Sequence, residues 1–132
     1  FDESLQRSLK AHGLPQLSRT ESMIMTHVQM NIIRPADIAR SLRLTRQAVH
    51  QTINSLVARG IFELRPDAED GRIRTVHLTE KGRAMRKDAN RIVREVTEVL
   101  AYRIGQQQVD ALRSAFRHPW GEPVMIGPRT AQ

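Results

Sequence analysis

The sequence contains no cysteine among its 132 residues. This absence excludes a disulfide scaffold, a zinc or iron–sulfur site with cysteine ligands, and thiol chemistry of a catalytic or redox-sensing kind. Such a composition fits a reducing, cytoplasmic compartment. Aromatic residues are also scarce, at 4%. Leucine, isoleucine, valine, methionine and alanine must therefore fill the hydrophobic core.

Long apolar runs are missing as well. No run approaches the ~18 residues that a membrane span needs, and no signal peptide opens the chain. The first residue is Phe1 rather than Met, so we expect the protein to continue before it. The length fits one domain, and the hydrophobic content of 39% is sufficient for a folded core.

Positive charge is in excess. Lys and Arg number 21 against 14 Asp and Glu, a net charge of +7, and 18 of the 21 cations are arginine. This balance predicts a polyanionic partner, with nucleic acid the first choice and an acidic membrane surface the second. No helical segment joins a strongly basic face to a large aromatic one, which argues against membrane binding. Arginine suits phosphates and guanine edges.

Apolar residues recur at helical spacing in most of the chain. Ser18 and Glu21 form a capping-box pattern, Pro35 suits the first turn of a helix, and Thr45 can cap the helix that Gly60 ends. The sequence therefore predicts helices over residues 2–12, from residue 18 onward, and over 35–42, 45–59, 80–103 and 106–117.

Two strand-like runs, residues 61–65 and 72–78, flank a turn-rich polar segment and predict a β-hairpin. Helix, tight turn, helix and hairpin follow one another in the order of a winged helix-turn-helix. Arg43 stands in the tight turn, where glycine is frequent. We therefore expect a mainly α fold with a small β-hairpin wing, an α+β winged helix-turn-helix.

The hairpin carries a recognisable pattern. Residues 70–82 contain Asp-x-Arg followed by a strand that ends in Leu-Thr-x-x-Gly, which resembles the wing signature of the MarR family of bacterial transcription regulators. Residues 37–42, 45–49 and 56–60 are similar to the two central helices of that family. The similarity is strong from about residue 18 to residue 82 and looser up to residue 116.

The resemblance implies a homodimer that binds DNA, usually represses genes and is often released by a small ligand. It implies a single MarR-like domain with terminal dimerisation helices, residues 1–17 and 83–117, and a DNA-binding lobe, residues 18–82. We expect residues 118–132 to form an irregular tail. Nothing in the pattern calls for a cofactor.

The exposed polar face of the second central helix offers donors and acceptors to base edges in the major groove. It carries Arg46, Gln47, His50, Gln51 and Asn54, and we expect Thr45, at the start of the helix, to serve as both cap and phosphate contact. In the wing, we expect Arg72 to enter the minor groove and Arg74 to contact phosphate. The resemblance implies that the Asp70 carboxylate braces the Arg72 side chain; an aspartate that only shapes the turn is the alternative.

Other interpretations of the sequence are weaker. Asp67, Glu69 and Asp70 form a carboxylate cluster, but all three lie in one turn without an obvious partner, so we predict no enzyme. The five histidines show no close ligand spacing, and we predict no metal site, with a metal sensor as the alternative. Met23, His27 and Met30 are candidates for a small-molecule effector site. A winged-helix module for architecture or protein interaction, without operator specificity, is the second functional hypothesis.

Overall fold

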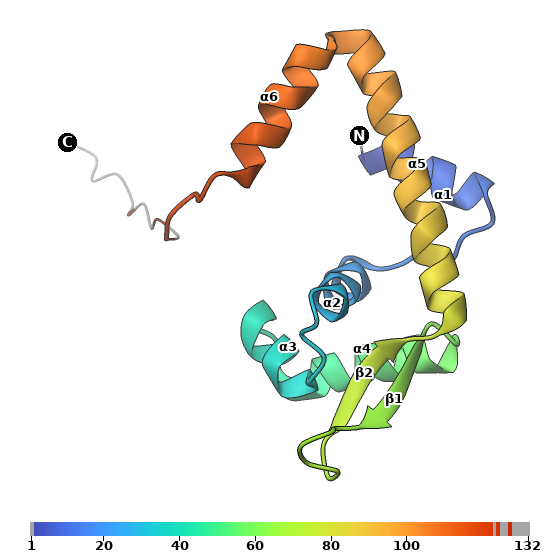
Figure 1. Cartoon of the computed structure of the whole chain (residues 1–132), viewed down its shortest axis with the longest axis vertical. Helices are drawn as coiled ribbons and strands as arrows, with labels where there is room; N and C mark the ends of the chain where they lie inside the picture. Colours follow the sequence, from blue (N-terminus) through green and yellow to red (C-terminus); the bar gives the residue numbers. More distant parts are fainter. Residues whose placement is uncertain (1, 123, 125–126, 128–132) are drawn as a thin grey trace. The chain divides into compact units, whose positions relative to one another are not determined.

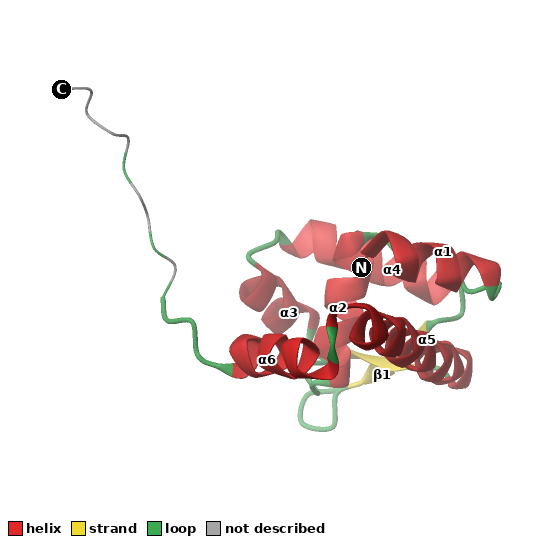
Figure 2. Ribbon diagram, turned by 90° about the horizontal axis from the view of Figure 1, so that it is seen from above, coloured by secondary structure: helices red, strands yellow, loops and turns green. Residues whose placement is uncertain are grey.

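The computed structural model describes residues 2–122, 124 and 127. Over these residues the chain forms six helices and one two-stranded sheet (Figure 1), and helix predominates (Figure 2). The elements are α1 (Asp2–Ala11), α2 (Arg19–Gln29), α3 (Pro35–Leu42), α4 (Arg46–Ala58), β1 (Phe62–Pro66), β2 (Arg74–Leu78), α5 (Glu80–Ile104) and α6 (Gln106–Arg117). The chain divides into two compact units between Arg94 and Glu95, within α5. The predicted mainly α fold with a hairpin wing is confirmed.

The predicted helix starts are confirmed in atomic detail. Ser18 Oγ accepts the Glu21 backbone N–H at 3.1 Å, and the Glu21 carboxylate accepts the Ser18 N–H at 2.7 Å, which completes the capping box of α2. Pro35 occupies the first turn of α3. Thr45 Oγ1 accepts the Ala48 N–H at 3.1 Å and so caps α4. These contacts satisfy backbone donors that have no partner within their helix.

Arg43 joins α3 to α4 in the left-handed region, with φ 53° and ψ 40°. Glycine takes this conformation at low cost and other residues rarely do. The Leu44 N–H donates to the Ala39 carbonyl at 3.0 Å across the turn, and Ala39 is only 4% exposed. The tight helix–helix connection therefore forms with arginine in the place where glycine is frequent.

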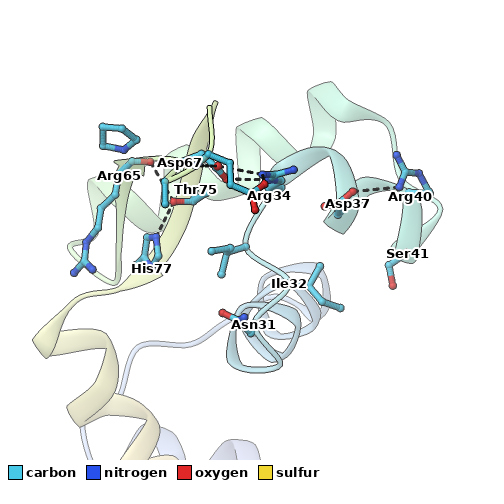
Figure 3. Close-up of a pocket in the computed structure, with 14 residues that line it drawn as sticks. Asn31, Ile32, Arg34, Asp37, Arg40, Ser41, Arg65, Asp67, Thr75 and His77 are labelled. Carbon is cyan, nitrogen blue, oxygen red and sulfur yellow. Dashed lines mark hydrogen bonds and ion pairs between the residues drawn. The ribbon is translucent and has the colours of Figure 1, made fainter. Parts of the chain in front are cut away.

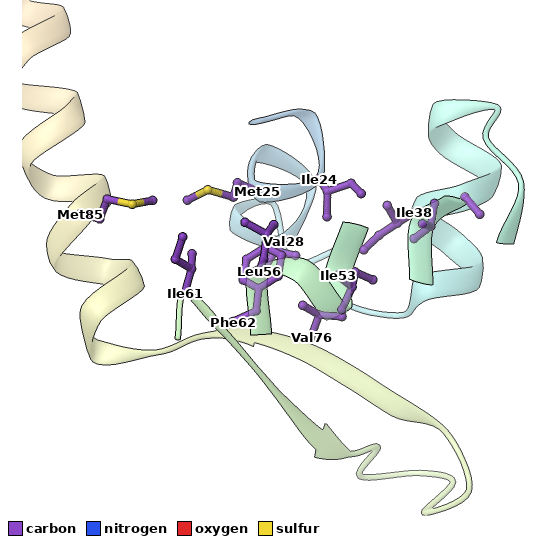
Figure 4. Packing of buried hydrophobic residues seen from close by; sticks show 12 residues of the cluster. Ile24, Met25, Val28, Ile38, Ile53, Leu56, Ile61, Phe62, Val76 and Met85 are labelled. Atoms are coloured by element: carbon purple, nitrogen blue, oxygen red, sulfur yellow. The ribbon is translucent and has the colours of Figure 1, made fainter. Parts of the chain in front are cut away.

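One hydrophobic core joins α2, α3, α4, the hairpin and the start of α5. Its largest fully buried side chains include Phe62, Ile24 and Leu56, and Figure 4 shows them converging from different elements. Each such side chain contributes about 1.5–3 kcal/mol by leaving water. The members of the cluster are Ile24, Met25, Val28, Ile38, Ala39, Val49, Ile53, Leu56, Ile61, Phe62, Val76 and Met85.

The hairpin is shorter than the sequence predicted, because β2 begins at Arg74 rather than near residue 72. Two loop hydrogen bonds account for the difference. The Asp67 N–H donates to the Ile73 carbonyl at 2.8 Å, and the Ile73 N–H donates to the Asp70 carbonyl at 3.0 Å. The linker between α2 and α3 adds one bond to the edge of β2, from the Val76 N–H to the Ile33 carbonyl at 2.9 Å.

The Leu-Thr-x-x-Gly pattern has a structural reason. Thr79 Oγ1 donates to the Gly60 carbonyl at 2.5 Å and accepts the Gly82 N–H at 3.0 Å. The first turn of α5 is thereby held against the end of α4. A Cβ on Gly82 would overlap the Ile61 carbonyl oxygen and lie 3.1 Å from Leu78 Cδ2. Only glycine allows this close approach.

We expect Gly82→Ala to lower the free energy of unfolding by about 1–3 kcal/mol, the usual cost of adding a methyl group to a closely packed site. Chemical denaturation of the variant measures this difference. The control is Gly71→Ala, since a Cβ at Gly71 would meet no atom within 4 Å. Equal stability of the Gly82 and Gly71 variants would contradict the packing explanation of the motif.

The predicted tail begins where α6 ends. Residues 118–122 contain no helix or strand. The rest of the prediction, for residues 123, 125, 126 and 128–132, lies outside the described residues.

Candidate nucleic-acid interface

Helix α4 presents one polar face to solvent. Its other face buries Val49, Ile53 and Leu56, each no more than 1% exposed. Within the described part of the chain, the polar side chains make no hydrogen bond or ion pair that would occupy them. Except for the capping contact of Thr45, their donors and acceptors are therefore available to a partner. The exposed residues are Thr45, Arg46, Gln47, His50, Gln51 and Asn54.

The hairpin tip lies in the same compact unit as α4 and projects from it (Figure 1). Asp70, Arg72 and Arg74 are all exposed. Asp70 Oδ1 accepts the backbone N–H of Arg72 at 3.0 Å, an arrangement typical of aspartate in turns. Among the described residues, the Arg72 guanidinium makes no hydrogen bond or ion pair. The bracing of that side chain by Asp70 stays a prediction.

Arg34, which the sequence analysis did not single out, links α3 to the wing. Its Nε donates to Asp67 Oδ2 at 2.9 Å, and its Nη2 donates to Asp67 Oδ1 and to Glu69 Oε2, each at 3.0 Å. Two members of the carboxylate cluster therefore surround one guanidinium. The cation and two backbone N–H groups hold the pKa of Asp67 at about 2, below its ordinary value of 3.8.

A cavity of about 840 Å³ lies beside this ion pair, between the linker that precedes α3, α3 itself and the hairpin (Figure 3). Several of its charged and polar groups pair with one another. Arg40 Nη1 donates to Asp37 at 3.2 Å, and His77 Nε2 lies 2.7 Å from Thr75 Oγ1. Burial, and secondarily the Arg65 cation, lower the pKa of His77.

The residues proposed for an effector site lie elsewhere on α2 and at its end. His27 packs between helices, since its ring nitrogens lie 2.9 Å from the Met23 carbonyl and 2.8 Å from Ser41 Oγ. Met23 and Met30 are 37% and 61% exposed. None of these three residues is among those that line the 840 Å³ cavity.

Among the described residues, no group of three or more His, Asp or Glu side chains is placed to hold a metal ion. Over the same residues, none of the helices combines the length and apolar character required to cross a membrane.

A family model for the MarR family matches residues 16–73. No curated protein matches the chain. Among solved structures, the reduced form of MarR from E. coli matches with a TM-score of 0.68 and 19% identity, over 88% of this chain and 85% of that one. Transcriptional regulator Tm0710 from Thermotoga maritima matches with 0.65 and 16%, over 86% and 79%. A mutant of MepR from S. aureus, bound to an oligodeoxyribonucleotide, matches with 0.65 and 15%, over 87% and 83%. The match over residues 16–73 agrees with the family resemblance of the sequence, and the solved structures share the fold.

Proposed function

We propose that this chain, a transcription regulator that carries the winged helix-turn-helix of the MarR family, represses genes by binding a palindromic operator as a homodimer. The observation that carries the proposal is the exposed, unoccupied polar face of α4 beside an exposed Arg72 and Arg74 in one compact unit. A helix with such a face fits the major groove, while an arginine at the wing tip suits the narrow minor groove.

The apolar surface of the second unit supports the homodimer. Leu112 and Phe116 on α6 are 49% and 72% exposed, and Val99 on α5 is 52% exposed. Trp120 stacks on Phe116 with ring centroids 5.7 Å apart and is itself 73% exposed. So many large apolar side chains in a unit that begins at residue 95 favour burial against a partner. We propose that this partner is a second copy of the chain.

We also propose that the DNA-bound dimer represses genes and that a small ligand releases it. A dimer on its operator blocks polymerase without further machinery, which favours repression. A small-molecule effector that binds beside Met23, His27 and Met30 would release the DNA. The 840 Å³ cavity has the volume of a small-molecule site, which is about 300–1,000 Å³, and is a second place for such a ligand. We place the protein in the cytoplasm, where its DNA partner lies.

We expect Gln47→Ala to weaken binding to the preferred operator by ~1–3 kcal/mol and to flatten the preference at one base position. Glutamine can pair with adenine through two hydrogen bonds, and Gln47 lies in the first turn of α4. Fluorescence anisotropy on operator and random DNA measures both affinities. Equal weakening on both DNAs would reassign Gln47 to the phosphates. Equal wild-type affinity for both would favour the architectural module.

A further inference from the structure

Arg34 occupies a junction in the fold. It ends the linker that follows α2, is the N-cap residue of α3, and has an extended backbone with φ −85° and ψ 124°. The following Pro35 disfavours a helical conformation at this position. The Arg34 side chain leaves the linker toward the hairpin and meets a residue 33 positions later in the sequence, as Figure 3 shows.

The contact with Asp67 is bidentate. Nε and Nη2 of Arg34 donate to the two different oxygens of the carboxylate, at 2.9 and 3.0 Å. Two parallel charge-assisted hydrogen bonds fix the relative orientation of the guanidinium and the carboxylate, which a single contact does not. The Asp67 side chain is only 8% exposed, whereas that of Arg34 is 37% exposed.

Asp67 also organises the loop at the wing tip. Its Oδ1 accepts the backbone N–H groups of Glu69 at 2.8 Å and Asp70 at 3.1 Å. Asp70 in turn accepts the backbone N–H of Arg72 at 3.0 Å. A continuous chain of hydrogen bonds therefore runs from Arg34, at the start of α3, to the backbone of Arg72.

The tip of the hairpin is the part that needs such a support. Phe62 and Val76 fix the base of the hairpin in the core, whereas none of residues 66–74 is buried there. A wing tip that moved freely would lose more conformational entropy when it docked on DNA. The contact that holds the tip in advance therefore strengthens binding without touching DNA.

We propose that the Arg34–Asp67 pair is a positioning contact that holds the wing tip in the orientation at which Arg72 meets the minor groove. The proposal rests on the proposed function, since it presumes that the wing contacts DNA. Arg34 and Asp67 act through Arg72, as positioning residues.

The positioning role and simple electrostatics predict different DNA affinities for two variants. Asp67→Asn removes a negative charge, so electrostatics alone predicts tighter DNA binding, whereas loss of the bidentate pair predicts weaker binding. Arg34→Lys keeps the positive charge but loses the planar fork. Electrostatics predicts unchanged affinity for it, and the positioning role predicts weaker binding.

The test measures the affinity of both variants for an operator selected from random DNA, with A/T-rich or G/C-rich sequence under the wing. We expect about tenfold weaker binding on the A/T-rich site, a smaller change on the G/C-rich site, and no further loss when Arg72→Ala is added. The matched controls are Asp37→Asn and Arg40→Lys, which alter an ion pair within α3 that includes no wing residue, and they should bind like wild type.

Hydrogen exchange on the variants supplies a readout that does not depend on DNA. Amides of residues 67–73 should exchange faster in Arg34→Lys than in Arg40→Lys, with α4 unchanged. Arg34→Lys leaves Asp67 able to accept its backbone hydrogen bonds, so the loop keeps its turn. If Asp67→Asn and Arg34→Lys bind DNA and exchange amide hydrogens like their control variants, the positioning role is wrong. If wild type shows no operator preference at all, the proposed function fails instead.

Discussion

Replacement of Leu112 and Phe116 by glutamate is expected to convert the dimer to a monomer and to weaken operator binding by about 10²–10⁴-fold. In the proposed dimer, each protomer presents one α4 to one half-site. When two such lobes are joined, the second binding event is intramolecular, which raises the affinity for the whole operator. Separating the lobes loses this gain in affinity, although each lobe keeps all its contacts to a half-site. Two buried carboxylates at an apolar interface are costly, because neither finds a partner there.

The control is Gln107→Glu with Ser114→Glu. These two residues are exposed and polar, and they lie on the other side of α6 at 100° per residue. The control adds the same negative charge without entering the apolar face. Light scattering gives the oligomeric state of wild type and both variants. A Leu112/Phe116 variant that is still dimeric would contradict the assignment of this face.

Arg72→Ala is expected to weaken operator binding by about 1–3 kcal/mol, with the largest loss where the minor groove is narrow and A/T-rich. Arg72→Lys should not fully restore affinity, because an ammonium is more strongly hydrated than a guanidinium and loses more hydration in the groove. Affinities for operators that differ only in the base pairs under the wing measure this preference.

Substitutions of Asp70 distinguish two explanations of DNA binding by the wing: that Asp70 positions Arg72, or that the wing acts only through its charge. Asp70→Ala removes the acceptor for the Arg72 N–H, so we expect it to reproduce much of the Arg72→Ala loss although it removes an acid beside DNA. Asp70→Asn keeps a side-chain oxygen for that hydrogen bond and should bind better than Asp70→Ala. If Asp70→Ala binds more tightly than wild type, and its effect adds to that of Arg72→Ala, the wing is only a charged loop.

Local signals in the sequence predicted most of the fold. The capping box at Ser18, the Pro35 start of α3 and the Thr45 cap of α4 each depend on residues within a few positions of one another. The final helix was predicted at its observed bounds, residues 106–117. Helical periodicity separated the buried Val49 and Ile53 from the polar face of α4. Local patterns of this kind are visible without knowledge of the tertiary structure.

The contact between Arg34 and Asp67 was not predictable by the same means. Its partners are 33 residues apart, and neither periodicity nor spacing connects a linker arginine to a turn aspartate. The cluster of Asp67, Glu69 and Asp70 was attributed to turn chemistry because no partner was evident in the sequence. In the folded chain Arg34 is that partner. Asp67 therefore both shapes the turn and binds Arg34.

The apolar face of α5 shows that sequence periodicity does not predict what an apolar face packs against. Met85, Ile92 and Val99 recur at helical spacing along α5, which predicts one apolar face. Met85 and Ile92 are buried at 8% and 1% exposure, but Val99 is 52% exposed. Periodicity identifies an apolar face and does not say what covers it. A face that one chain leaves exposed is where we propose the second copy to bind.

The most direct test of sequence-specific operator binding is a selection of random double-stranded DNA by wild type and by Gln47→Ala in parallel. We expect wild type to enrich a two-fold symmetric site whose half-sites are centred about 34–36 Å apart, one turn of DNA. We also expect Gln47→Ala to enrich the same site with one symmetric pair of base positions relaxed. Enrichment of no motif by wild type, at a salt concentration where it still binds DNA, would contradict the account.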